Sequence, residues 1–159
     1  MIISYFLRGS MLVKLNQTAL WQNLRVVNQL QKKEIKIFEK LIEVLPSSKD
    51  EVIDEWLDRL ERHTKHRITD EEARIISLGY SFLSEHRKEH TQAMDRIRKA
   101  RADWEEDRNL LTLWNFLERD YFDWFMQHLV DFDFSSENHE KRNRKPRNKV
   151  QPQLELIDV

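Results

Sequence analysis

Apolar side chains recur every three or four positions along most of this chain, the spacing that places them on one face of an α-helix. The pattern predicts a first long helix over residues 16–45, stopped by Pro46, and a shorter second helix over 48–66. A third helix is predicted to begin at Thr69, and a fourth to reach Asp131. The opposite faces are densely charged, so each helix has one face for a core and one for water.

Capping boxes mark three of the predicted helix starts. In such a box the first side chain and a glutamate three positions later satisfy backbone N–H groups that the helix leaves unpaired. The pairs are Ser48 with Glu51, Thr69 with Glu72 and Asp103 with Glu106. At ~100° per residue, the apolar stripes of residues 75–104 and 110–125 are out of phase by roughly a third of a turn. The slip predicts a tight reversal near 102–106.

The predicted fold class is therefore all-α: an antiparallel bundle of four helices, three long and one short, over residues 16–134. Met11 is a second candidate start, so we expect the fold not to need the N-terminal segment 1–15. The short second helix would leave half of the bundle with three walls and an exposed apolar stripe. Such a stripe predicts a coiled-coil-like contact and a homodimer; in the alternative, the chain termini fold over the gap.

The composition agrees with an all-α fold. Hydrophobic residues make up 40% of the chain and charged residues 35%, while the net charge is only −1. Two glycines and three prolines are too few to punctuate a multi-stranded sheet. The absence of cysteine excludes disulfides, thiol catalysis and cysteine-ligated zinc. No apolar run approaches the ~20 residues of a membrane span, so we expect a cytoplasmic protein with no membrane partner.

The helical pattern stops after Phe134, and residues 135–159 are expected to form a flexible basic tail. Within it, the cations Lys141, Arg142, Arg144, Lys145, Arg147 and Lys149 surround Pro146. Such a cluster predicts weak, nonspecific binding to nucleic-acid phosphates.

The end of this tail carries a short peptide motif, Gln153-Leu154-Glu155-Leu156-Ile157. It resembles the pentapeptide Gln-Leu-x-Leu-Phe by which many bacterial proteins bind the DNA polymerase sliding clamp. Gln153, Leu154 and Leu156 match, and Ile157 stands where phenylalanine is usual. The resemblance implies that these four residues bind a partner from a flexible tether. In the alternative, the apolar residues of the peptide dock back onto the bundle.

Two histidines fall within an apolar stripe. His86 and His90 lie one helical turn apart, a spacing at which two imidazoles can chelate one metal ion, with Glu118 as a candidate third ligand. The favoured interpretation is that they are core or interface histidines, hydrogen-bonded to Tyr121, to Glu118 or to each other. We therefore predict no cofactor. Ferritin-like di-iron bundles are excluded, because they need Glu-x-x-His pairs and the chain has none.

One further pattern is typical of an enzyme. Arg59 and His66 are separated by six residues, and this stretch resembles the small all-α ribonucleases of the HEPN class. The resemblance implies RNA cleavage with these two residues as catalytic groups. The residue after the arginine is usually polar in that class, whereas here it is Leu60.

The main functional prediction is a non-enzymatic helical module or adaptor that binds another protein or itself, because nucleophile elbows and phosphate loops are absent from the chain. The alternative is a nucleic-acid-associated accessory factor that its tail tethers to the replication sliding clamp. An HEPN-like ribonuclease or a metal-binding bundle is the third candidate.

Overall fold

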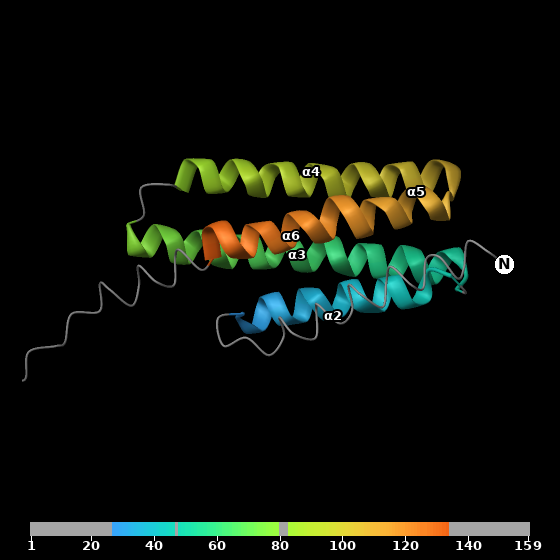
Figure 1. The fold of residues 1–159 in the computed structure, drawn as a ribbon, viewed down its shortest axis with the longest axis horizontal. Coiled ribbons are helices and arrows are strands. Elements are labelled where there is room, and N and C mark those ends of the chain that lie inside the picture. The colour runs from blue at the N-terminus through green and yellow to red at the C-terminus, as the bar shows by residue number, and fades with distance from the viewer. Residues whose placement is uncertain (1–26, 47, 80–82, 134–159) are drawn as a thin grey trace, which may run out of the picture.

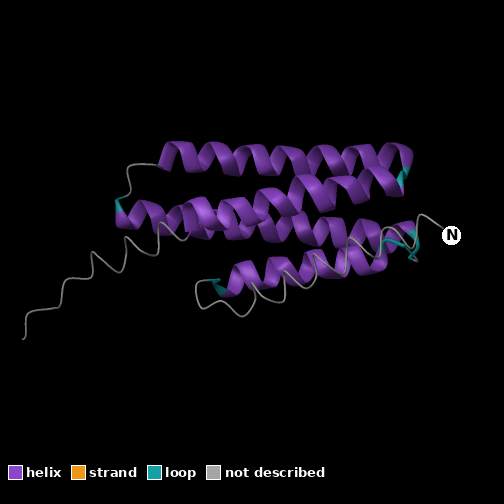
Figure 2. Ribbon diagram, viewed as in Figure 1, coloured by secondary structure: helices purple, strands orange, loops and turns teal. Residues whose placement is uncertain are grey.

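The computed structural model describes residues 27–46, 48–79 and 83–133, and within them the chain forms four antiparallel helical rods (Figure 1). Figure 2 shows only helices and turns among these residues, which confirms the predicted all-α class. The rods are α2 (Gln29–Val44), α3 (Asp50–Leu78), α4 (Leu83–Asp107), and a last rod made of α5 (Leu110–Asn115), η1 (Phe116–Tyr121), α6 (Phe122–His128) and η2 (Leu129–Asp133).

The core lies where the four rods meet. α3 packs against α2 and α4, and the last rod closes the bundle against α4 and α2. The ring of Phe38 on α2 stacks on that of Phe122, with centroids 5.2 Å apart. The buried apolar side chains of the core include Leu41, Leu57, Leu60, Ile97, Trp104, Leu113 and Leu117. The apolar stripes read from the sequence therefore face one another.

The boundary between the second and third helices is misplaced in the prediction. α3 continues through the predicted break at 66–69, where the hydroxyl of Thr69 donates to the carbonyl of Lys65. A threonine inside a helix often satisfies its hydroxyl in this way, so Thr69 with Glu72 is not a capping box. The predicted capping box of Ser48 with Glu51 is also wrong. The N-cap residue of α3 is Lys49, and its side chain makes no capping hydrogen bond.

The helix that was predicted to be short is therefore 29 residues long. It ends at Gly79, which adopts a left-handed conformation with a φ of 69°. α3 is longer than α2, which has 16 residues, and than α4, which has 25, so a short second helix does not leave half of the bundle with three walls. Self-association stays a prediction, but it has lost this support.

The first rod begins later than predicted. The side chain of Asn28 accepts from the backbone N–H of Gln31, and the Gln31 side chain accepts from that of Asn28, which completes a capping box. α2 starts directly after this box, so a continuous helix from residue 16 is wrong. Residues 16–26 themselves lie outside the described part of the chain. The predicted stop at Pro46 is confirmed, because α2 ends at Val44.

The reversal after α4 is confirmed, but it lies a few residues beyond 102–106. α4 continues to Asp107, so Asp103 and Glu106 are inside a helix and form no capping box. Arg108 turns the chain with a φ of 52°, and Asn109 caps α5 by accepting from two backbone N–H groups. The guanidinium of Arg108 is 2.5 Å from Asp54 and lies over the ring of Trp104. These contacts hold an otherwise unfavourable backbone conformation.

The last rod is not a regular α-helix. η1 and η2 are π-helical, and they flank α6, whose final residue is His128. A π-helical turn holds one more residue than an α-helical turn and is found mostly as a short insertion, often at functional sites. Of the two, η1 precedes His128, so its π-helical turn affects the direction in which that side chain points.

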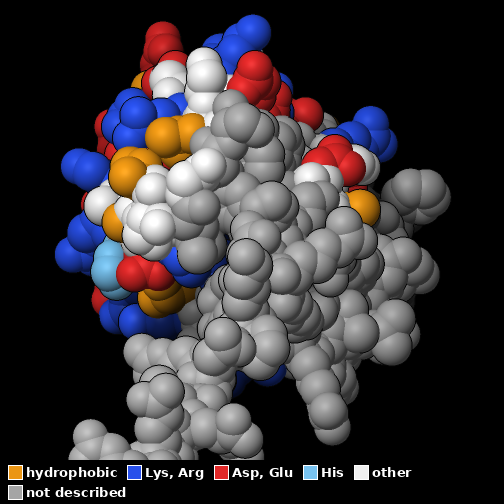
Figure 3. Space-filling view, turned by 90° about the vertical axis from the view of Figure 1, so that its left-hand side faces the viewer, with side chains coloured by type: hydrophobic (Ala, Val, Ile, Leu, Met, Phe, Trp, Pro, Cys, Tyr) orange, Lys and Arg blue, Asp and Glu red, His pale blue; other side chains and the backbone are white. Residues whose placement is uncertain are grey.

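The outer surface is highly charged. Figure 3 views the bundle from the end where α3 stops and α4 starts, and on its described part acidic and basic side chains mingle around a few hydrophobic ones. Among the described helices none has both the length and the apolar character needed to cross a bilayer.

Gly79→Ala tests the end of α3. No atom would meet the new Cβ within 4 Å, so the cost comes from the left-handed backbone alone. We expect the free energy of unfolding to fall by about 1–2 kcal/mol, measured by urea titration. Gly79→Asn is the matched control and should cost less, because asparagine tolerates this conformation. An alanine variant as stable as the wild type would contradict the assigned helix end.

Candidate metal centre

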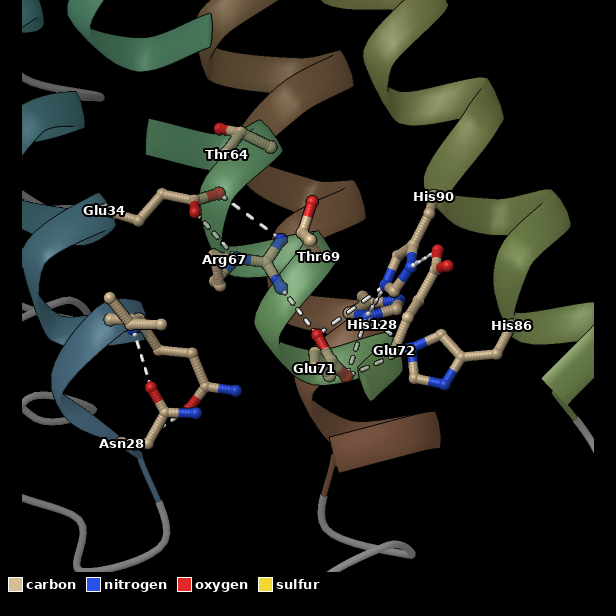
Figure 4. Close-up of polar contacts among 12 residues, drawn as sticks. Asn28, Glu34, Thr64, Arg67, Thr69, Glu71, Glu72, His86, His90 and His128 are labelled. Atoms are coloured by element: carbon tan, nitrogen blue, oxygen red, sulfur yellow. Dashed lines mark hydrogen bonds and ion pairs between the residues drawn. The ribbon is translucent and has the colours of Figure 1, made fainter. Parts of the chain in front are cut away.

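Three imidazoles meet in the core at one end of the bundle. The Nε2 atom of His128 lies 3.1 Å from Nε2 of His86 and 3.2 Å from Nε2 of His90. Figure 4 shows His86 and His90 extending from α4 toward His128. All three side chains are buried, with at most 2% of each exposed. The same nitrogen of each ring thus points to one shared position.

The carboxylate of Glu71 completes this cluster. Its Oε1 atom lies 3.0 Å from Nε2 of His86 and 3.7 Å from Nε2 of His128, while its Oε2 atom lies 3.6 Å from Nε2 of His90. Glu71 is itself buried. One donor atom from each of the four residues can be chosen so that all lie within 4.8 Å of one another. We call Glu71, His86, His90 and His128 the His3Glu cluster.

The connections of the bundle explain this meeting. Glu71 lies about two turns before the end of α3, and His86 and His90 lie in the first two turns of α4. The reversal between these helices, which begins at Gly79, therefore brings the three residues to the same level. His90 follows His86 by four positions, so both face the same way. His128 arrives from the far end of the last rod.

The ring of His90 is also held on its other side. Its Nδ1 atom lies 3.0 Å from Oε1 of Glu72, whose second oxygen accepts from Arg87 at 3.0 Å. Partial burial acts to raise the pKa of Glu72, but the hydrogen bonds to His90 and Arg87 outweigh it and leave the pKa lowered. An ionised Glu72 keeps the proton of His90 on Nδ1. The Nε2 atom of His90 then presents a lone pair to the cluster, as in the histidine–carboxylate pairs around protein-bound metals.

The protonation state of His128 also suits metal binding. Burial lowers its pKa to about 4; the hydrogen bond to Glu71 and the charge of that carboxylate oppose this effect, and the charge of Arg67 adds to it. At neutral pH the imidazole is therefore uncharged. Neutral imidazoles and carboxylates are the donor groups that zinc, iron, nickel and copper accept.

On the side away from the histidines, Glu71 belongs to a chain of buried ion pairs with Arg67 and Glu34. Arg67 is 1% exposed and donates from Nη1 to Oε2 of Glu71 at 2.9 Å. Its Nε atom donates to Glu34 on α2 at 2.6 Å, and its Nη2 atom lies 3.5 Å from the same carboxylate. The guanidinium also lies 5.4 Å from the ring centroid of Phe125. Glu71 is thus fixed by a side chain that is itself fixed on several sides.

Tyr121 closes this chain on the side of α2. Its hydroxyl donates to Glu34 and lies 3.2 Å from the hydroxyl of Thr64. Burial, followed by the negative charge of Glu34 and the hydrogen bond to it, raises the pKa of Tyr121 well above 10. The phenol therefore stays protonated and remains a donor to Glu34 under ordinary conditions.

The structure brings together part of the candidate ligand set. His86 and His90 are both buried in one cluster, as predicted for core histidines, but the histidine to which each hydrogen-bonds is His128. Glu118 is not part of it, because its carboxylate accepts from the indole of Trp114 at 3.2 Å on the same rod. The physical reason is the reversal, which lies at 108–109 instead of near 103. A shift of about five residues there moves the facing positions by about ten, so His128 replaces Glu118 and Tyr121 opposite α4.

Glu71 was missed for a related reason. The sequence put it in the first turn of a new helix, whereas it lies deep in α3. One usable signal was the order His86-Arg87-Lys88-Glu89-His90, because His-x-x-Glu-His is a known zinc-binding pattern of one peptidase class. A second was the pairing of an arginine and a glutamate four apart, Arg67 and Glu71, on the face of α3 that also carries Ile68 and Ile75.

The remaining candidates are not brought into a site. Arg59 pairs with Glu55 and covers the ring of Trp56, while His66 is exposed farther along the same helix. The clamp-like peptide residues Gln153, Leu154, Leu156 and Ile157 and the basic residues Lys141, Arg142, Arg144, Lys145, Arg147 and Lys149 lie outside the described part of the chain. Their predicted binding to a clamp and to nucleic acid stays a prediction.

Comparison of the chain with protein-family models, with curated proteins and with solved structures finds no match.

Alkaline unfolding tests the buried chain. Above pH ~10 the unfolded chain loses the Tyr121 proton while the folded chain keeps it, so stability is present below pH 10 and is lost as the pH rises. We expect the free energy of unfolding to fall more steeply in the wild type than in Tyr121→Phe, by up to about 1.4 kcal/mol per pH unit. Urea titrations from pH 8 to 11 measure both slopes.

The control for this experiment is Thr64→Val, which removes a neighbouring hydroxyl and no titrating group. Its slope should parallel that of the wild type. Equal slopes in the wild type and Tyr121→Phe would contradict a buried, protonated Tyr121.

Proposed function

We propose that this chain is a metal-binding helical bundle that holds one divalent transition-metal ion, zinc in the first place, in the His3Glu cluster. The observation that carries the proposal is the convergence of three Nε2 atoms and one carboxylate from three different rods. The ion would join α3, α4 and α6 at the end of the bundle.

The spacing of the donor atoms supports a tetrahedral ion. With zinc–nitrogen bonds of ~2.0–2.1 Å, the ligands of a tetrahedral site lie about 3.3 Å from one another. The separations of His128 from His86 and His90 are 3.1 and 3.2 Å, and Oε1 of Glu71 lies 3.0 Å from Nε2 of His86 and 3.7 Å from Nε2 of His128. These distances suit a cation of this size.

Hydrogen bonds alone do not satisfy all three histidine nitrogens of the cluster. Nε2 of His128 faces two other Nε2 atoms, and a neutral imidazole nitrogen carries either one proton or one lone pair. It could satisfy one of these neighbours well, but not both. A cation at the shared position would accept a lone pair from each nitrogen at once. A bound metal ion would therefore satisfy all three Nε2 atoms together.

The balance of charge also favours a divalent ion. Among the described residues, Glu34 and Glu71 are buried with one arginine, Arg67, which leaves one negative charge in this part of the core. Glu72 adds a second at the rim of the cluster. Buried charges are tolerated where partners compensate them, and an ion of charge +2 would compensate both.

We assign the ion a structural role. A catalytic zinc keeps one position for water or substrate, whereas a structural zinc has four protein ligands. Here four protein donors are available, and each belongs to a side chain that is at most 3% exposed. Glu89, the acidic residue of the His-x-x-Glu-His pattern, is in no contact that would make it a base for a metal-bound water. A hydrolytic function is therefore disfavoured.

Metal content tests the proposal directly. Protein produced without a histidine tag should carry about one zinc ion per chain by elemental analysis, and chelation should lower its melting temperature. His86→Asn, His90→Asn and His128→Asn should each lose most of the metal. His66→Asn is the matched control, because this histidine lies on α3 but is exposed and outside the cluster.

Two results would count against the proposal. One is wild-type protein that stays metal-free after incubation with zinc, cobalt, nickel and iron(II) salts. The other is metal that His66→Asn loses as readily as the cluster variants. In either case the cluster would be a hydrogen-bonded histidine core of the kind predicted from the sequence.

Glu72→Gln tests the outer support of the site. The amide keeps the size of the side chain but accepts more weakly from Nδ1 of His90 and carries no charge. We expect zinc to bind about 10- to 100-fold more weakly, as measured by competition with a chromophoric chelator. Glu85→Gln, an exposed residue of the first turn of α4, should leave the affinity unchanged. Equal affinities in the wild type and Glu72→Gln would show that His90 needs no such partner.

A further inference from the structure

Arg67 holds one of the two oxygens of Glu71, and this contact bears on which metals the site takes. Resting on the metal site proposed above, we propose that Arg67 is the residue that sets its selectivity. By engaging Oε2 of Glu71 it leaves Oε1 alone for the ion, so that the cluster offers four donors and not five. The chain would then favour ions that accept a tetrahedron, such as Zn²⁺, over Mn²⁺, which prefers more ligands.

The two carboxylate oxygens have different partners. Nη1 of Arg67 lies 2.9 Å from Oε2, and this bond joins two side chains of the same helix that are both buried. Oε1 is the atom nearest to the histidines, 3.0 Å from Nε2 of His86. A carboxylate chelates a metal through both oxygens only if both are available. The bond from Arg67 therefore favours a single metal–oxygen bond.

Arg67 has little freedom to release Oε2. Its Nε atom is bound to Glu34 on α2 at 2.6 Å, and Glu34 in turn accepts from Tyr121. The guanidinium lies 5.4 Å from the ring centroid of Phe125 and 6.0 Å from that of Trp124. Arginine presents its donors in a rigid, planar fork, so fixing Nε on Glu34 also fixes the direction of Nη1. Residues from the other rods thus determine how Glu71 meets the ion.

The number of donors matters because metals differ in what they accept. Zinc has no geometric preference of its own and takes four nitrogen, sulfur or oxygen ligands readily. Manganese and magnesium favour six ligands, mostly oxygen. If Oε2 were released, Glu71 could chelate through both oxygens and raise the count to five. The site would then lose part of its preference for zinc.

The test uses a variant that conserves the charge of the core. Glu34→Gln with Arg67→Met removes one negative and one positive charge together, and methionine fills a similar volume with no donor. Glu34→Gln alone is the matched comparison: its amide oxygen can still accept from Nε of Arg67, so the guanidinium keeps its direction and its bond to Oε2 of Glu71. Arg62→Met is a second control, since this arginine is exposed on α3 and pairs with Asp58. Circular dichroism checks that each variant is folded.

The readouts are the visible spectrum of bound Co²⁺ and the competition of Zn²⁺ with Mn²⁺. The wild type and both controls should give the intense bands of tetrahedral Co²⁺ and a strong preference for zinc. In the double variant we expect the bands to weaken toward those of five-coordinate Co²⁺. The ratio of the Mn²⁺ and Zn²⁺ dissociation constants should fall by about tenfold or more. A purely structural role of Arg67 would change stability but not the coordination spectrum.

The outcomes separate the two proposals. Wild-type protein that binds neither Zn²⁺ nor Co²⁺ overturns the metal site itself. If the wild type binds zinc but the Co²⁺ spectrum and the metal selectivity of the double variant are unchanged, only the role of Arg67 is overturned.

X-ray absorption of the zinc-loaded wild type decides the matter if the double variant does not fold. Four nitrogen or oxygen neighbours at about 2.0 Å from zinc support the proposal. A fifth neighbour, as the second oxygen of Glu71 would supply, overturns it.

Discussion

Burying charged groups together is the constraint on which this bundle depends. Each ion removed from water costs several kcal/mol unless partners replace the lost hydration. Arg67 meets this demand between Glu34 and Glu71, and it does so only while α2 and α3 keep their present register. Leaving one partner of such a pair alone is strongly destabilising. The polar chain therefore selects one alignment of helices from the several that apolar stripes alone would allow.

The same constraint connects the fold to the candidate metal centre. Glu71 faces Arg67 with one oxygen and His86 with the other, so a residue that aligns the helices is also a proposed ligand. Tyr121 extends the chain to the last rod, which also delivers His128. Changes anywhere along this path should be felt as both altered stability and altered metal affinity. Such coupling is the normal behaviour of sites whose ligands come from separate elements of the fold.

Much of the fold could be predicted from the sequence, since helical periodicity and the stop at Pro46 are local signals. The false capping box at Thr69 and the false helix boundary at 66–69 have one cause. Thr69 with Glu72 has the spacing of a capping box, but a hydroxyl inside a helix is equally satisfied by the carbonyl of Lys65. The predicted partners of His86 were wrong because they depend on how α4 and the last rod align. The reversal between them lies about five residues later than predicted, so other residues face His86. His86 and His90 were found by spacing, while Glu71 and His128 required the three-dimensional arrangement.

The π-helical turns of the last rod have a consequence for how this chain tolerates insertion and deletion. Each such turn contains a residue that a regular helix would not need. Removing one residue from η1 would restore ordinary α-helical geometry there, and the backbone itself would gain from it. The positions that follow would keep nearly the same direction around the rod axis, because a π-helical turn absorbs one extra residue, and the imidazole of His128 would stay in the cluster. At the present length of the rod, by contrast, a regular α-helix over η1 would turn His128 away from the cluster by roughly 100°, so the π-helical turn compensates for one extra residue.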